Sequence, residues 1–89
     1  MIWKIRYNPI ADKDLGKLDP QSRKIIKAYL DDKVSKLSHP KQLGKPLRHG
    51  FRGLWRYRVD KFRILCKLEE DKLIILVVKI AKRDVVYED

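Results

Sequence analysis

The sequence predicts an α+β fold: an N-terminal strand, a helical hairpin, and then a three-stranded antiparallel meander whose sheet packs on the helices. Three patterns predict it. Two Asx-Pro pairs each precede an apolar stripe of helical spacing, residues 54–68 alternate between apolar and basic side chains, and residues 73–78 form a strand-sized apolar run. A chain of 89 residues is expected to make a single domain, residues 1–89, with one modest core.

The first strand and the two helices are predicted from their boundaries. Residues 2–7 alternate loosely and predict a strand, which Asn8-Pro9 ends. Asn and Asp are good N-caps and Pro suits the first helical position, so helices are expected to begin at Pro9 and Pro20. The second helix is the longer one and is expected to end at residues 38–40. Its apolar stripe consists of Ile26, Leu30, Val34 and Leu37, widened by Ile25 and Tyr29.

The second half of the chain predicts a loop and three strands. Residues 41–50 contain two glycines and a proline and are expected to form a loop. A hairpin follows, with strands at residues 54–59 and 62–68 joined by a two-residue turn, Asp60-Lys61. Residues 73–78 are apolar on both faces, which is typical of a central strand. We expect the N-terminal strand to join the edge of this sheet and the helical hairpin to cover one face.

The composition limits the kind of partner and the compartment. The net charge is +10, from 22 Lys and Arg against 12 Asp and Glu, which favours nucleic acid over an acidic protein or an anionic membrane. The single cysteine, Cys66, excludes an internal disulfide and fits a reducing compartment. The N-terminus lacks the apolar region of a signal peptide, and no apolar run reaches the length of a membrane span. A cytoplasmic protein is therefore expected, with no membrane association.

Arginines gather on the face that the helices leave open. Alternation places Arg56 and Arg58 on that face, and strand pairing should bring Arg63 alongside them. Like charges this close repel, so an external anion is expected. Arginine holds phosphate through two parallel hydrogen bonds. Arg83 and Tyr87 can reach the same edge if the last strand lies beside the return strand of the hairpin.

Two further residues are expected to be structural. No cofactor is expected. Trp55 and Cys66 share the alternation of the core-facing residues and are expected to be buried. Neither a Cys/His cluster for zinc nor a carboxylate cluster for magnesium is present in the sequence. The sequence therefore offers no candidate site for zinc or magnesium.

With these patterns in place, the chain resembles the RelE/ParE superfamily of toxins from bacterial type II toxin–antitoxin systems, and more closely its RelE-like branch. The resemblance extends over the whole chain. It rests on the N-terminal strand followed by Asn-Pro and a helical hairpin, on KPLRHGFRGLWRYRV, and on the C-terminal half VDKFRILCKLEEDKLIILVVKIAKRDVVYED with its ending basic-Arg-x-x-Val-Tyr.

The resemblance implies an enzyme. RelE-type toxins are metal-independent endoribonucleases (mRNA interferases) that cut messenger RNA, commonly on the ribosome, and so inhibit translation. The implied reaction is attack of a ribose 2′-hydroxyl on the adjacent phosphate. The residues that match the family's catalytic positions are Arg56, Arg58, Arg63, Arg83 and Tyr87. The basic residues expected to bind RNA around them are Arg48, His49, Arg52, Lys61, Lys67 and Lys82.

The resemblance also implies partners. They are a cognate antitoxin with an acidic or amphipathic peptide segment, messenger RNA and the ribosome, and operator DNA only through the antitoxin. Two other functions stay open from the sequence. A ParE-like inhibitor of DNA gyrase would share the fold without cutting RNA, and a catalytically inactive RNA- or ribosome-binding module would have the same basic charge.

Overall fold

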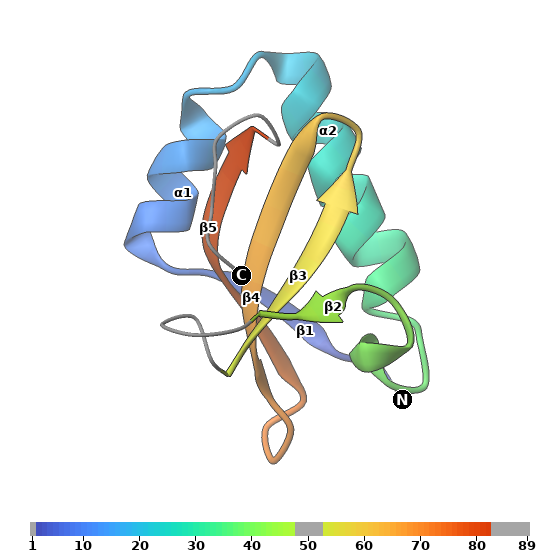
Figure 1. Cartoon of the computed structure of the whole chain (residues 1–89). Helices are drawn as coiled ribbons and strands as arrows, with labels where there is room; N and C mark the ends of the chain where they lie inside the picture. The colour runs from blue at the N-terminus through green and yellow to red at the C-terminus, as the bar shows by residue number, and fades with distance from the viewer. Residues whose placement is uncertain (1, 48–52, 83–89) are drawn as a thin grey trace.

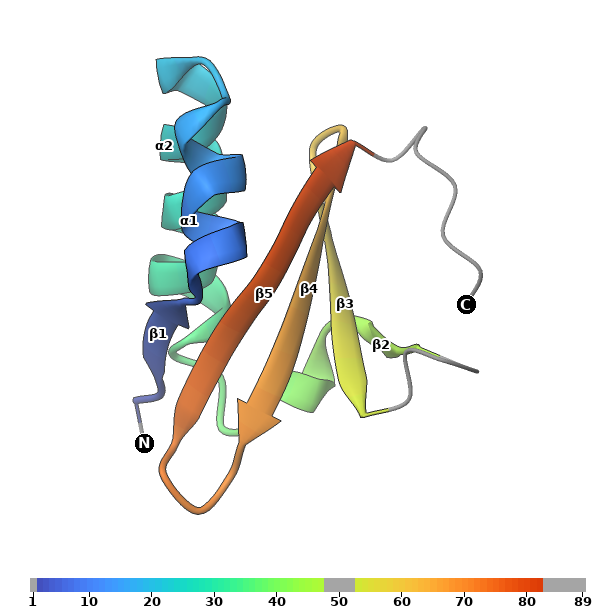
Figure 2. The same cartoon turned by 90° about the vertical axis from the view of Figure 1, so that its left-hand side faces the viewer.

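Five strands form one sheet, and the helices pack on one side of it (Figures 1 and 2). The structure is a computed structural model that describes residues 2–47 and 53–82. The sheet order is β1-β5-β4-β3-β2. In chain order the elements are β1 (Lys4–Tyr7), α1 (Pro9–Gly16), α2 (Pro20–Ala28), the π-helix η1 (Tyr29–Val34), the 3₁₀-helix η2 (Pro40–Gln42), β2 (Lys45–Pro46), β3 (Leu54–Val59), β4 (Phe62–Glu69) and β5 (Ile74–Lys82).

This architecture confirms the predicted α+β class. In Figure 2, α1 and α2 lie on one side of the sheet, and no helix of the described chain lies on the other side. β3, β4 and β5 form the antiparallel meander, while β1 joins it at the far side of β5 in parallel. The core lies between the two layers. Its fully buried members include Ile26, Leu30 and Val34 from the helical segment and Tyr57, Ile64, Cys66, Ile75 and Val77 from the sheet.

Both helices begin where the sequence predicts. The Asn8 side chain accepts a hydrogen bond from the Ala11 N–H at 2.8 Å, and the Asp19 side chain accepts one from the Ser22 N–H at 3.2 Å. Each cap is followed by a proline at the first helical position. These caps satisfy backbone donors that a helix start leaves unpaired.

The second helical segment ends earlier than predicted. α2 continues as a π-turn that ends at Val34, with the Ser35 N–H donating to the Leu30 carbonyl at 2.8 Å. Ser35 is also bonded to the start of the chain, because its hydroxyl donates to the Trp3 carbonyl and its own carbonyl accepts from the Trp3 N–H. Leu37 therefore lies beyond the helix, and the predicted end at residues 38–40 was wrong. His39 instead caps η2.

The predicted loop at residues 41–50 contains a short strand, β2, which the sequence analysis missed. Its two residues pair with Arg56 and Trp55 of β3. The approach depends on Gly44, whose φ is +79° and whose added Cβ would collide with the Arg56 carbonyl oxygen. The Trp55 indole N–H donates to the Leu43 carbonyl at 2.7 Å and holds the same segment.

The hairpin turn and the last strand complete the sheet. Asp60-Lys61 forms the predicted turn, with Asp60 at φ +55°, a conformation that Asp tolerates better than most residues. The last strand is central, as predicted, but it extends to Lys82. Among the residues that the structure describes, its later half has no strand beyond it, because β1 pairs only as far as Val77. There α1 covers the edge, and the Asp14 carboxylate accepts the Ile80 N–H at 3.1 Å.

The helices of residues 2–47 and 53–82 are all too short or too polar to cross a membrane.

Ser35→Ala is expected to lower the free energy of unfolding by about 1–3 kcal/mol, because the buried Trp3 carbonyl would lose its hydroxyl donor. Urea denaturation measures the change. Ser38→Ala is the matched control, since the Ser38 hydroxyl bonds Gln42 at an exposed position and its loss should stay within about 0.5 kcal/mol. Equal losses in the two variants would contradict this role of Ser35.

Candidate functional site

The face of the sheet that no described helix covers carries the arginines of the hairpin, and we call Arg56, Arg58 and Arg63 the arginine face. Tyr57 and Val59 alternate with the first two and are buried in the core. The arrangement follows from period-two alternation within β3 and β4.

Arg58 and Arg63 lie directly opposite each other across β3 and β4. The Leu47 N–H donates to the Leu54 carbonyl at 3.1 Å, so Leu54 directs its backbone groups toward β2. By alternation Arg58 does the same, which makes Arg58–Arg63 a non-hydrogen-bonded pair of the antiparallel ladder. In such a pair the Cα atoms are only about 4.5 Å apart and the side chains are closest. On β5 the neighbour of Arg63 is the small Ala81.

The next row of the arginine face is tightly packed. Arg56 lies opposite Leu65, and the two residues are only 9% and 3% exposed. Arg63 is half-buried, and its buried Nε has no hydrogen-bond partner in the part of the chain that the structure describes. A buried donor without an acceptor costs free energy. An incoming acceptor such as a phosphate oxygen would remove that cost.

The structure brings together three of the five predicted catalytic residues, Arg56, Arg58 and Arg63. Arg83 and Tyr87 lie outside the described residues, as do the predicted RNA-binding residues Arg48, His49 and Arg52.

The other predicted RNA-binding residues are placed in three different ways. Lys67 lies on the same face as the arginines, opposite Leu54 and Leu76. Lys61 lies in the hairpin turn, with its Nζ 5.9 Å from the centre of the Phe62 ring. Lys82, at the end of β5, pairs with the buried Phe62. Residues paired in this way share a face of the sheet, so Lys82 lies on the face that the helices cover and not with the arginines.

The residues beneath the arginines are structural. The Tyr57 hydroxyl donates to the Pro40 carbonyl at 2.8 Å, and burial raises the pKa of this phenol well above its usual value. Burial likewise raises the pKa of the Cys66 thiol, so Cys66 is an inert core residue, as expected. Trp55, expected in the core, is only partly buried and packs against its edge.

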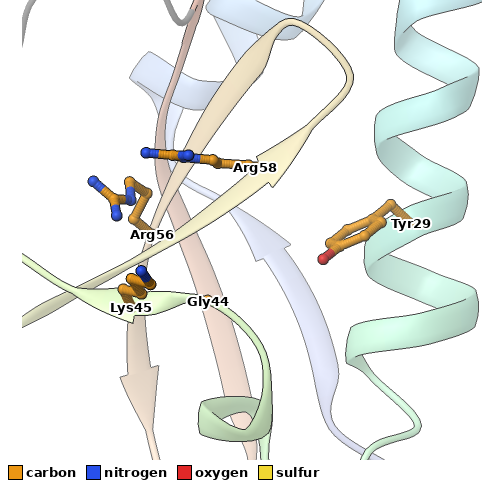
Figure 3. Close-up of a pocket in the computed structure, with 5 residues that line it drawn as sticks. All are labelled: Tyr29, Gly44, Lys45, Arg56 and Arg58. Carbon is orange, nitrogen blue, oxygen red and sulfur yellow. The ribbon is translucent and has the colours of Figure 1, made fainter.

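A pocket of about 220 Å³ lies beside the start of β2 (Figure 3). It is lined by Tyr29, Gly44, Lys45, Arg56 and Arg58. In Figure 3 the side chains of Lys45, Arg56 and Arg58 project to one side of β3, while Tyr29 lies across the strand edge with its hydroxyl directed toward the strand. The sequence analysis had placed Tyr29 only on the apolar stripe of the helix.

Within residues 2–47 and 53–82, no three His, Cys, Asp or Glu side chains cluster closely enough to hold a metal ion.

Known structures with this fold define its class. The toxin–antitoxin complex RelBE2 from Mycobacterium tuberculosis contains a chain that superposes with a TM-score of 0.85 at 23% identity, covering 93% of both chains. The intact RelBE toxin–antitoxin complex of E. coli gives a TM-score of 0.68 at 15% identity, covering 90% of this chain and 95% of that one. The fold is that of RelE-like toxins.

The sequence comparisons give the family. A family model described as the ParE toxin of the type II toxin–antitoxin system parDE matches residues 5–87, and the chain belongs to this family of the RelE/ParE superfamily. Toxin RelG from Mycobacterium tuberculosis is 27% identical over 88 residues, which is 98% of each protein. The predicted resemblance to type II RelE-like toxins is therefore confirmed.

Arg58→Gln is expected to stabilise the fold by about 0.2–1 kcal/mol at low salt, because it removes one of two like charges directly opposite each other. The gain should shrink at high salt as the repulsion is screened. Chemical denaturation at two salt concentrations measures both effects. Lys67→Gln is the control, because Lys67 faces leucines on both neighbouring strands. A less stable Arg58→Gln protein at low salt would contradict the repulsion.

Proposed function

We propose that this type II toxin is a metal-independent endoribonuclease that cleaves messenger RNA on the ribosome and so inhibits translation. The observation that carries the proposal is the Arg58–Arg63 pair, in which two guanidinium-bearing residues directly face each other on the open side of the sheet. Folding alone gives no reason to place like charges opposite each other. A phosphate group between them would supply the missing negative charge.

The proposed reaction breaks one phosphodiester bond without adding water. The ribose 2′-oxygen attacks the adjacent phosphorus and loses its proton, while the bond from phosphorus to the 5′-oxygen breaks and that oxygen gains a proton. The products are a 2′,3′-cyclic phosphate and a free 5′-hydroxyl. Negative charge grows on the phosphate oxygens in the transition state, and a fixed donor aimed at such charge contributes about 3–4 kcal/mol.

Each residue has a proposed role in this reaction. Arg58 and Arg63 bind the scissile phosphate, and the packed Arg56 holds the RNA backbone beside it. From the family resemblance we assign the proton transfers to Tyr87 and Arg83. A phenol has a reference pKa of about 10, and neighbouring arginines favour its phenolate. Such a base is poor at neutral pH, so binding on the ribosome would help by holding the RNA aligned for attack.

The partners follow from the same charge. RelBE2 and RelBE are described as toxin–antitoxin complexes, and we propose that a cognate antitoxin likewise binds this chain through an acidic peptide that covers the arginine face. The net charge of +10 favours such a partner electrostatically. The complex would lie in the cytoplasm, with the arginine face covered, and would bind operator DNA only through the antitoxin.

A second function is supported by the family model, which carries the name of ParE. A ParE-like inhibitor of DNA gyrase would stall replication and leave messenger RNA intact. A catalytically inactive RNA-binding module would also leave RNA intact, without stalling replication.

Primer extension on messenger RNA from translating ribosomes tests the proposal. Wild-type protein is expected to produce cuts within codons, and Arg63→Ala should reduce the rate about 10²–10³-fold because it removes one charge-stabilising donor. Tyr87→Phe should also reduce the rate. Lys36→Ala is the control, since it removes an equal charge at an exposed position outside the sheet. Intact RNA with wild-type protein would contradict the proposal, and a replication assay would then distinguish the two alternatives.

A further inference from the structure

Beside the pocket, the edge of β3 that faces away from β4 is not paired with another described strand. β2 pairs with β3 only at Arg56 and Trp55, and the chain bends away at Gly44. The described part of the sheet therefore has no strand next to Arg58 on that side. Since alternation directs the Arg58 N–H and C=O away from β4, these two groups point to the open edge of β3, where Arg58 lines the pocket. Together they present one donor and one acceptor side by side.

Tyr29 supplies a further polar group across the opening. Its hydroxyl is directed toward β3 in Figure 3. Burial raises the pKa of this phenol, so it keeps its proton and can donate. The Lys33 ammonium lies 5.4 Å from the centre of the Tyr29 ring. That contact covers one face of the ring and leaves the hydroxyl available for hydrogen bonding.

The size of the pocket limits its occupant. About 220 Å³ is the space of roughly seven water molecules at about 30 Å³ each. It is below the roughly 300–1,000 Å³ of sites that take drug-sized ligands. One flat ring fits, whereas a whole nucleotide does not. Arg56 and Arg58 line the pocket, but in Figure 3 their side chains project to the side of β3 away from Tyr29. The Tyr29 side therefore suits a group with hydrogen-bonding edges, and the cations at the other side are placed for the phosphate beside it.

We propose that this pocket binds one unpaired RNA base, while the phosphate beside that base lies on the arginine face around the edge of β3. The proposal rests on the proposed function, in that it requires RNA as the ligand. Proteins that recognise single-stranded RNA commonly bond the edges of splayed bases. A backbone donor–acceptor pair and a phenol hydroxyl can make such bonds, and they would give the cleavage a base preference at one position next to the cut.

Binding of short single-stranded RNA tests the pocket without cleavage. The probes are 2′-O-methyl oligoribonucleotides, each with one abasic site at a different position. At one position, loss of the base should weaken binding to the wild-type protein about tenfold or more. In Tyr29→Phe that penalty should be smaller by about two- to tenfold, the value of one hydrogen bond. Tyr7→Phe, on the opposite edge strand, should behave as the wild type.

The outcomes separate the pocket from the proposed function. Equal abasic penalties in wild type and Tyr29→Phe would overturn the base pocket, even if the protein cleaves RNA. A side chain of the antitoxin would then be the occupant to test. Failure of the wild-type protein to bind any of these oligoribonucleotides would overturn the pocket and RNA binding together. Cleavage on the ribosome, measured by primer extension, tests the enzyme independently of either result.

Discussion

Arg58 and Arg63 repel each other, and the β3–β4 hairpin nevertheless holds them directly opposite. The pairing of the two strands fixes the backbone positions of both residues. The two-residue turn pairs Val59 with Phe62, and the buried pair Tyr57–Ile64 lies on the other side. A slip of one residue would carry the core-facing side chains of the strand to the open face. The core therefore enforces a position that electrostatics opposes, and an anion is what would make that position favourable.

The rest of the fold keeps this hairpin rigid. Asp14 of α1 bonds the part of β5 that lies beyond β1, so the strand next to β4 is fixed along its length. Ser35 joins the end of the helical segment to the start of the chain. Gly44 lets β2 lie against Arg56. A site that acts by fixed charge needs such support, because preorganised donors lose no free energy in reorienting during the reaction.

The sequence predicted those features that depend on local signals or on strand alternation. The helix starts follow from Asn8 and Asp19 next to prolines, and the grouping of Arg56, Arg58 and Arg63 follows from period two and a two-residue turn. Features that depend on contacts distant in sequence were missed. The π-turn ends where Ser35 meets Trp3, and β2 exists because Gly44 reaches β3. The pocket at Tyr29 depends in turn on where β2 begins, and no local pattern encodes that position.

A double-mutant cycle on Arg58 and Arg63, measured by RNA binding, tests most directly whether the two residues hold a single phosphate. The affinity of single-stranded RNA is compared among wild type, Arg58→Gln, Arg63→Gln and the double variant. If one phosphate bridges the pair, each single substitution should cost nearly as much as both together, with a coupling of about 0.5–3 kcal/mol. Costs that simply add would show that the two arginines bind independently, and would contradict the account.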